Sequence, residues 1–241
     1  RMARRLILAS LILTTGQIAC AEIPGVMTRM PTHERVIALT FDACQAEKVM
    51  HLDQAILDVL ERHPVPFTVF ASGRFVQSNR SAVAELARRP GVRVENHSWS
   101  HARDMRVMSD DEVESEIRRT DEAIENVTGR RPELMRFPGG NVDERLVRIA
   151  QSTGHRVVHW RWAEGDPARA IDASMLISQT LERVRPGDIL IFHINGRGWH
   201  TAEALPDILN ELETRGYRFV DLVGLWGSVA PSESSDEIKH L

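Results

Sequence analysis

The sequence predicts an α/β fold, a closed or nearly closed (β/α) barrel of about seven parallel strands. Short apolar runs alternate with segments of helical periodicity along most of the chain, which is the pattern of repeated strand–helix units. The 241 residues, 42% hydrophobic and 27% charged, suit one domain with a large core. No glycine-rich phosphate loop follows the first long apolar run, so the sequence does not favour an open nucleotide-binding sheet.

The expected strands are apolar runs bounded by turn residues or by polar residues. They are expected at residues 35–42, 66–72, 91–98, 133–138, 155–162, 188–194 and 217–222. The segments between them carry apolar residues at helical spacing and are expected to be helices. These lie at residues 51–63, 81–89, 109–129, 143–154, 172–184 and 201–216. Ser109 and Glu112 form a capping-box pattern, and Ser81 is the expected N-cap of its helix.

Both ends of the chain are expected to lie outside the fold. Residues 1–21 combine three arginines, an apolar run and an Ala-Cys-Ala sequence, which is the layout of a signal peptide. The apolar run is too short for a transmembrane helix, although a plain membrane anchor or lipidation of Cys20 are alternatives. The catalytic domain is expected to span residues 22–227, and residues 228–241 form a polar, flexible tail.

Charge and cysteine content exclude two further classes. Loss of residues 1–21 would remove three arginines and no acid, taking the formal charge from −4 to −7. An acidic protein of this kind argues against nucleic acid as a partner. Only Cys44 would then remain, so no intrachain disulfide is expected and the core must hold the fold. A signal peptide without a disulfide framework fits a bacterial periplasm or exterior.

Polar residues recur where the expected strands end. In a parallel β/α fold these ends meet on one face, which is where such folds collect their chemistry. The residues in question are Asp42, Glu95, His97, His101, Arg136, Asp166 and His193. Two histidines four residues apart can bind one metal ion, although capping or surface positions are the simpler alternative. His193 could be a satisfied core histidine or a general acid.

Arg136 precedes a Pro-Gly-Gly turn. An inward guanidinium could hold Asp42 ionised and oriented, whereas an ordinary ion pair at the barrel rim is the alternative. The turn also leaves backbone N–H groups, at Gly139 in particular, that could meet an oxyanion.

Several of these segments together resemble the polysaccharide deacetylases, the NodB-type enzymes of carbohydrate esterase family 4. The similarity covers about residues 34–223. It rests on "LTFDAC", which looks like the family's TFDD motif, and on "HSWSH", "RFPGG", "WAEGDP" and "ILIFH", which occur in the family's order. The resemblance implies a distorted (β/α) barrel, a divalent metal that is commonly zinc, and hydrolysis of N-acetyl groups on an amino-sugar polymer or, less often, of O-acetyl esters.

The resemblance also implies roles for individual residues. Asp42 matches the catalytic base, Arg136 the arginine that orients it, and His193 the general acid. Asp166 matches the acid that tunes this histidine. His97 and His101 match the metal-binding histidines, and an N–H near Gly139 would help to hold the oxyanion.

The sequence departs from the family at the third metal ligand. Ala43 occupies the position of the second aspartate of TFDD, and a methyl group cannot bind a metal. Three hypotheses follow. Glu95 replaces the ligand, because residues two apart on a strand face the same way and Glu95 precedes His97 by two. Alternatively, Cys44 supplies a thiolate, or no third protein ligand exists and Asp42 or water fills the place. The D-x-x-D-W motif also departs, with Ala163 and Pro167 at two of its positions.

The last hypothesis leads to a rival function. Without a metal, the protein would be a carbohydrate-binding relative that no longer catalyses. Retention of Asp42, Arg136, Asp166 and His193 argues for an enzyme, because a pure binder needs none of that acid–base set. The expected partner is an acetylated glycan, with no stable membrane insertion once the signal peptide is removed.

Overall fold

The computed structural model describes residues 23–224 of the chain. The expected signal peptide at residues 1–21 and the expected tail at 228–241 lie outside the described residues. Within the described part, no helix has both the length and the apolar character needed to cross a membrane.

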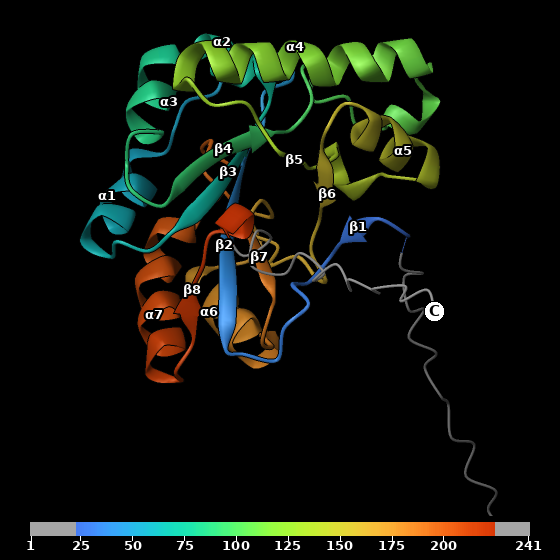
Figure 1. The fold of residues 1–241 in the computed structure, drawn as a ribbon. Helices are drawn as coiled ribbons and strands as arrows, with labels where there is room; N and C mark the ends of the chain where they lie inside the picture. Colours follow the sequence, from blue (N-terminus) through green and yellow to red (C-terminus); the bar gives the residue numbers. More distant parts are fainter. Residues whose placement is uncertain (1–22, 225–241) are drawn as a thin grey trace, which may run out of the picture.

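A curled parallel sheet forms the centre of the molecule (Figure 1). Its strand order is β1-β6-β5-β4-β3-β2-β7, and β8 pairs with β2 outside this path. The strands are β1 (Val26–Met27), β2 (Val36–Ala43), β3 (Phe67–Ala71), β4 (Val92–Asn96), β5 (Leu134–Met135), β6 (Arg156–Val158), β7 (Ile189–His193) and β8 (Arg218–Phe219). An isolated antiparallel bridge between Arg29 and Asp188 links the two edges of the curl. The expectation of a distorted barrel is thus confirmed, with most of its closure left to one bridge.

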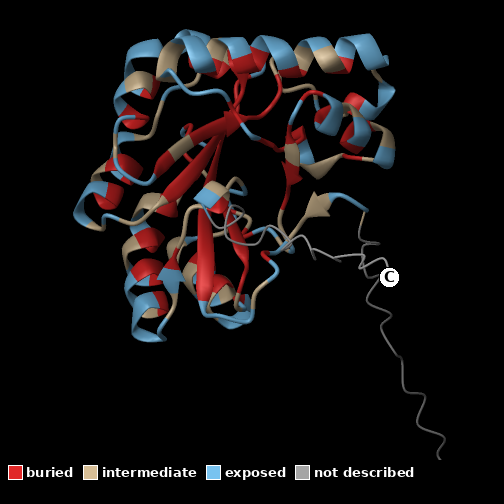
Figure 2. Cartoon of the chain, viewed as in Figure 1, coloured by how far each residue is buried: buried red, intermediate tan, exposed pale blue. Residues whose placement is uncertain are grey.

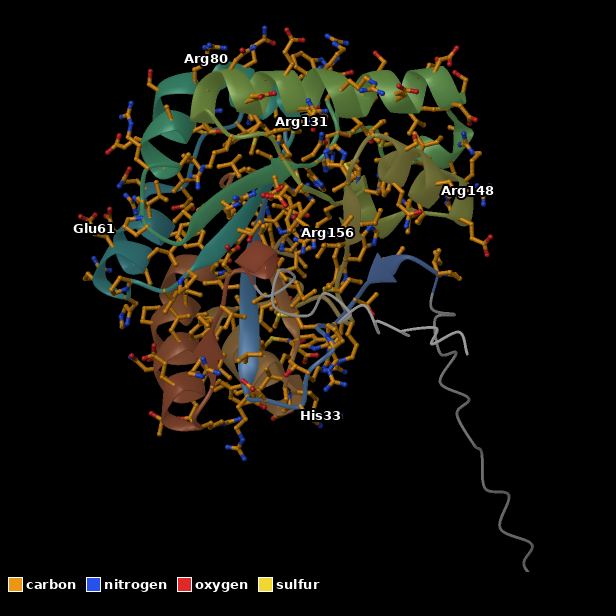
Figure 3. All side chains as sticks on the ribbon, in the orientation of Figure 1. His33, Glu61, Arg80, Arg131, Arg148 and Arg156 are labelled. Carbon is orange, nitrogen blue, oxygen red and sulfur yellow. The ribbon has the colours of Figure 1, made fainter. Side chains whose placement is uncertain are left out.

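Helices cover the outer side of the curl. They are α1 (Gln54–Arg62), α2 (Gly73–Ser78), α3 (Arg80–Leu86), α4 (Asp110–Thr128), α5 (Glu144–Ser152), α6 (Ala173–Arg183) and α7 (Thr201–Thr214), with short 3₁₀ turns at Met105–Val107 and Pro138–Gly140. Burial is continuous along β2 and β3, whereas each helix is buried on one side only (Figure 2). Charged side chains such as Glu61, Arg80 and Arg148 point away from the sheet (Figure 3).

Helix α4 begins as expected, with the Ser109 hydroxyl accepting from the Glu112 N–H and the Glu112 carboxylate accepting from the Ser109 N–H. The expected cap at Ser81 is wrong. The helix begins at Arg80 after Asn79, because the Asn79 amide donates to the Met50 and Phe75 carbonyls and ties this turn to its surroundings.

Alternation along β2 decides what reaches the inside of the curl. Ile37, Leu39, Phe41 and Ala43 belong to the large core cluster that includes residues of α1 and α7, whereas Val36 and Ala38 belong to a separate cluster with Phe70 and Leu134. Since side chains on a strand alternate between two faces, Thr40 and Asp42 lie on the second, inner side. The sheet therefore delivers a carboxylate to the carboxyl end of the barrel interior.

Candidate active site

Seven of the eight residues singled out from the sequence as candidate site residues line one cavity or contact a residue that does. The cavity is about 350 Å³ and opens at the carboxyl ends of the strands. It is lined by Asp42, Cys44, His101, Arg103, Gly139, Asn141, Trp160, Ala163, Gly165, Asp166, Pro167, Ile191, His193 and Arg197. Arg136 and His97 lie fully buried behind Asp42, and only Glu95 takes no part.

Arg136 fixes the orientation of Asp42. Its Nη1 donates to Asp42 Oδ1 and to the Thr40 hydroxyl oxygen, both at 2.9 Å, and its guanidinium lies over the Phe70 ring at 4.0 Å. Thr40 in turn donates to the Leu190 carbonyl at 2.6 Å. Burial alone would raise the pKa of Asp42, but the charged Arg136 guanidinium beside it helps to bring that pKa below its usual value. Asp42 is therefore an ionised, immobile carboxylate at the cavity wall.

Asp166 fixes the orientation of His193. Its Nδ1 lies 2.9 Å from Asp166 Oδ1, and its backbone N–H donates to Oδ2 at 2.7 Å. The Thr201 hydroxyl donates to the same Oδ2 at 2.8 Å. Because the carboxylate only accepts, the imidazole proton sits on Nδ1 and Nε2 is left for the cavity. Asp42 and His193 are register partners on β2 and β7, so neighbouring strands present them side by side.

The two histidines of "HSWSH" come from a tightly turned loop after β4. Their ring centroids are 5.0 Å apart. Ser98 and His101 have φ values of 62° and 54°, a conformation that costs a non-glycine residue free energy. One carboxylate oxygen of Glu116, on α4, accepts hydrogen bonds from the Trp99 and Ser100 N–H groups and from the Ser100 hydroxyl at 2.8–3.0 Å. This contact offsets the strain in the loop.

Both histidines are neutral at ordinary pH. Burial lowers the pKa of His97, and burial together with His97 lowers the pKa of His101 to about 3. His97 Nδ1 lies 2.7 Å from the Arg136 carbonyl oxygen. A carbonyl only accepts, so Nδ1 carries the proton and the lone pair is on Nε2. Neutral imidazoles with one nitrogen fixed in this way are suited to metal binding.

Glu95 does not complete this pair. It lies on β4, two residues before His97, and it is fully buried. Its carboxylate, however, accepts from Arg93 Nε at 3.1 Å and from the N–H groups of Glu133 and Leu134 at 2.7 and 2.8 Å. These contacts hold it at the start of the very short β5, and the hypothesis that Glu95 replaces the lost ligand is corrected on this ground.

The sulfur of Cys44 lies beside the two histidines, at the place expected of a third metal ligand. Potential ligand atoms of Cys44, His97 and His101 all lie within 4.8 Å of one another, and a second group of this kind contains Asp42, Cys44 and His193. Burial, and then Asp42, raise the pKa of the Cys44 thiol well above its usual value. Ala43, by contrast, belongs to the core on the other side of β2. The donor set of two imidazoles and one sulfur fits a borderline-soft divalent metal ion.

The Pro-Gly-Gly turn closes another side of the cavity. Gly139 and Gly140 have φ values of 66° and 73°, which favour glycine. The N–H groups of Gly140 and Asn141 donate within the turn, to the Phe137 and Pro138 carbonyls. In the part of the chain that the structure describes, the Gly139 N–H makes no hydrogen bond, so this donor is free to meet a ligand.

Three contributors to the site carried no signal in the sequence. Thr40 and Thr201 are ordinary strand and helix residues until their hydroxyls meet Arg136 and Asp166. Glu116 lies in the middle of an amphipathic helix, where an acidic residue usually faces solvent. Only the packing of α4 against the loop after β4 assigns it a partner.

Comparisons with known proteins identify relatives of the chain. Residues 29–158 match the family model described as polysaccharide deacetylase. A peptidoglycan-N-acetylglucosamine deacetylase of Bacillus cereus is 30% identical over 203 residues, covering 83% of this chain and 92% of the relative.

Solved structures also resemble the chain. A peptidoglycan N-acetylglucosamine deacetylase bound to an N-hydroxybenzamide compound superimposes with a TM-score of 0.76 at 26% identity, covering 83% of this chain and 92% of the other. A CE4 family pseudoenzyme from Bacillus anthracis superimposes with a TM-score of 0.74 at 23% identity, covering 84% and 69%, which shows a shared fold.

Proposed function

Because the chain belongs to the polysaccharide deacetylase family, we propose that it is a metal-dependent hydrolase that removes N-acetyl groups from an amino-sugar polysaccharide or oligosaccharide. The observation that carries this proposal is the convergence of two oriented pairs on one cavity: Asp42 with Arg136, and His193 with Asp166. A carboxylate and an imidazole that are each held by a partner and face one cavity are what an acid–base hydrolysis needs.

The metal would be held by His97 and His101 together with a third donor from this chain. A divalent ion bound there supplies Lewis-acid activation of the acetyl carbonyl and of the attacking water. Zinc is the ion that the imidazole-rich donor set favours.

Asp42 is proposed to accept the proton of the attacking water. Its Oδ1 is occupied by Arg136, so Oδ2, which lies 3.5 Å from His97 Nε2, is the oxygen that faces the histidine pair. Holding one oxygen fixed leaves the other in a single orientation, which reduces the reorganisation that the proton transfer requires. The low pKa of Asp42 keeps it in the basic form throughout the neutral range.

His193 is proposed to donate a proton to the leaving amine. Asp166 fixes its tautomer and stabilises the imidazolium form that precedes the transfer. The free Gly139 N–H is proposed to stabilise the developing oxyanion. Trp160, Ala163 and Pro167 line the same cavity, so the sugar ring would rest against an apolar wall.

Deacetylation of an N-acetylated substrate tests the proposal. Acetate release should be measured with peptidoglycan, the substrate named for the relatives, and with N-acetylglucosamine oligomers, for the wild type, Asp42→Asn and a matched surface variant, Asp58→Asn. We expect release by the wild type and by Asp58→Asn, and a loss of at least about 100-fold in Asp42→Asn. Binding of the glycan without acetate release would instead favour the carbohydrate-binding alternative.

An O-acetylated glycan in the same assay separates amide from ester hydrolysis. Release from the O-acetylated substrate alone would assign the protein as an acetyl-ester hydrolase. The expected place of action is the periplasm or the cell exterior, in keeping with the arginine-rich, apolar start of the sequence and with the peptidoglycan substrates of the relatives.

A further inference from the structure

We propose that Cys44 supplies a thiolate as the third protein ligand of the metal, so that the site consists of two histidines and one sulfur. This inference deepens the proposed function, on which it rests, by naming the donor that replaces the carboxylate absent at Ala43. Metal coordination by Cys44 can be tested without a turnover assay.

The spacing of the donor atoms supports the assignment. Cys44 Sγ lies 3.6 Å from His97 Nε2. Two ligands of one tetrahedral zinc ion, at about 2.3 Å for sulfur and about 2.05 Å for nitrogen, are themselves about 3.6 Å apart. His101 contributes a nitrogen within the same 4.8 Å group. Cys44 and His97 therefore already have the separation that a shared ion would impose, and His101 lies close enough to join them.

The orientation of the imidazole supports it as well. His97 Nδ1 donates to the Arg136 carbonyl at 2.7 Å, so the nitrogen that faces Cys44 is the one with the lone pair. A metal-bound histidine ordinarily has its other nitrogen fixed by a carbonyl or carboxylate in this way. The approach of sulfur to Nε2 thus brings together two donors that a cation can join.

The backbone holds Cys44 at this place. Its carbonyl accepts from Asn195 Nδ2 at 2.6 Å, and the following residue, Gln45, donates its N–H to the Ser72 hydroxyl at 3.0 Å. Cys44 follows Asp42 by two residues, so the direction of β2 carries both side chains toward the cavity, which both line. Cys44 is 5% exposed and lines that cavity.

A sulfur ligand changes the order of metal preference. Thiolates favour zinc, cobalt and cadmium, whereas a carboxylate in the same place suits magnesium and manganese better. We therefore expect the protein to retain zinc and cobalt when magnesium is in large excess. Binding would also release the thiol proton, because a coordinated thiol is deprotonated.

Cobalt spectroscopy of the apo-protein tests the ligand directly. Cobalt(II) bound to a thiolate shows an intense near-ultraviolet charge-transfer band, which imidazole and carboxylate ligands do not produce. We expect this band in the wild type at one equivalent of cobalt and its loss in Cys44→Ser. Cys44→Asp should bind cobalt without the band. Glu95→Gln, which alters the rival carboxylate, should keep it.

Two further variants distinguish the two clusters of possible metal ligands that contain Cys44, one with His97 and His101 and the other with Asp42 and His193. His101→Ala should weaken cobalt binding by more than about 100-fold, since removal of a ligand exceeds the 10- to 100-fold effect of its outer partners. His193→Ala should keep the band. Thermal unfolding of each apo-variant controls for loss of the fold, and Cys44→Asp provides a second readout if Cys44→Ser does not fold.

A wild-type cobalt complex without the charge-transfer band, or a band that survives in Cys44→Ser, would overturn the inference. A band that is lost in His193→Ala but kept in His101→Ala would overturn the proposed ligand set of His97, His101 and Cys44. Failure of the proposed function looks different: the band would be present while no acetylated glycan releases acetate. Acetate release by a protein whose cobalt form lacks the band would leave the function in place and remove only the cysteine ligand.

Discussion

Replacing Glu116 by alanine should weaken metal binding although Glu116 lies outside the cavity. The loop that carries His97 and His101 has two non-glycine residues at positive φ, each at a cost of about 1 to 2 kcal/mol. A single Glu116 oxygen accepts three hydrogen bonds from this loop. Without them the loop is expected to relax, and the two imidazoles would no longer be held together.

The expected magnitude follows from those three bonds. Hydrogen bonds to a charged acceptor contribute about 1.5 to 3 kcal/mol each when isolated, and three that share one half-buried oxygen are assigned about 2 to 3 kcal/mol together. Metal affinity should therefore fall by about 30- to 150-fold in Glu116→Ala. Glu116→Gln keeps an accepting oxygen at the same place and should lose about 3- to 10-fold.

Zinc affinity, measured by competition with a chromophoric chelator, is the appropriate assay. Glu114→Ala is a matched control, because Glu114 lies on the same helix and pairs with the exposed Arg118. We expect it to bind zinc as the wild type does. Wild-type affinity in Glu116→Ala, or an equal loss in Glu114→Ala, would refute the reasoning.

Three other predictions concern the buried charges. Arg136→Met should destabilise the protein by about 3 to 5 kcal/mol in urea unfolding, since Asp42 would be left buried without its partner; a loss below about 1 kcal/mol would contradict this. Asp166→Asn should lower kcat by at least about 100-fold with KM little changed, because His193 loses its orienting acceptor; an unchanged pH–rate profile with full kcat would argue against it. Burial lowers the pKa of His159 to about 3, so the folded state must keep it neutral and loses stability as pH falls below about 6.5, by about 2 kcal/mol at pH 5. His159→Phe should remove this part of the difference between pH 7 and pH 5, and urea unfolding at both values measures it.

The sequence was informative about the fold because apolar strands and amphipathic helices alternate with clear boundaries. Helix α4 is the best example: its capping box and its αL glycine at Gly129 mark both ends by local chemistry alone. The two-residue strand β1 and the helix α2 were not predicted. Val26–Met27 is too short to show a period, and α2 begins at Gly73, where Trp99 packs so closely that a Cβ would clash.

The candidate site was less predictable than the fold. Positions at strand ends identified Asp42, Arg136 and His193, because topology alone brings such ends together. The choice between Glu95 and Cys44 as third metal ligand depends on the positions of the Glu95 carboxylate and the Cys44 sulfur. Alternation along a strand does not determine these positions. The Glu95 carboxylate instead accepts hydrogen bonds from the N–H groups of Glu133 and Leu134, where β5 begins.

The registration of Asp42 opposite His193 has a consequence for how such a site can diversify. Adjacent strands in a sheet are about 4.8 Å apart, and this spacing is set by backbone hydrogen bonds rather than by any loop. Insertions or deletions in the loops around the cavity can reshape its rim while the two side chains keep their separation. The two side chains proposed to react and the rim of the cavity thus belong to different parts of the chain, and each can change without altering the other.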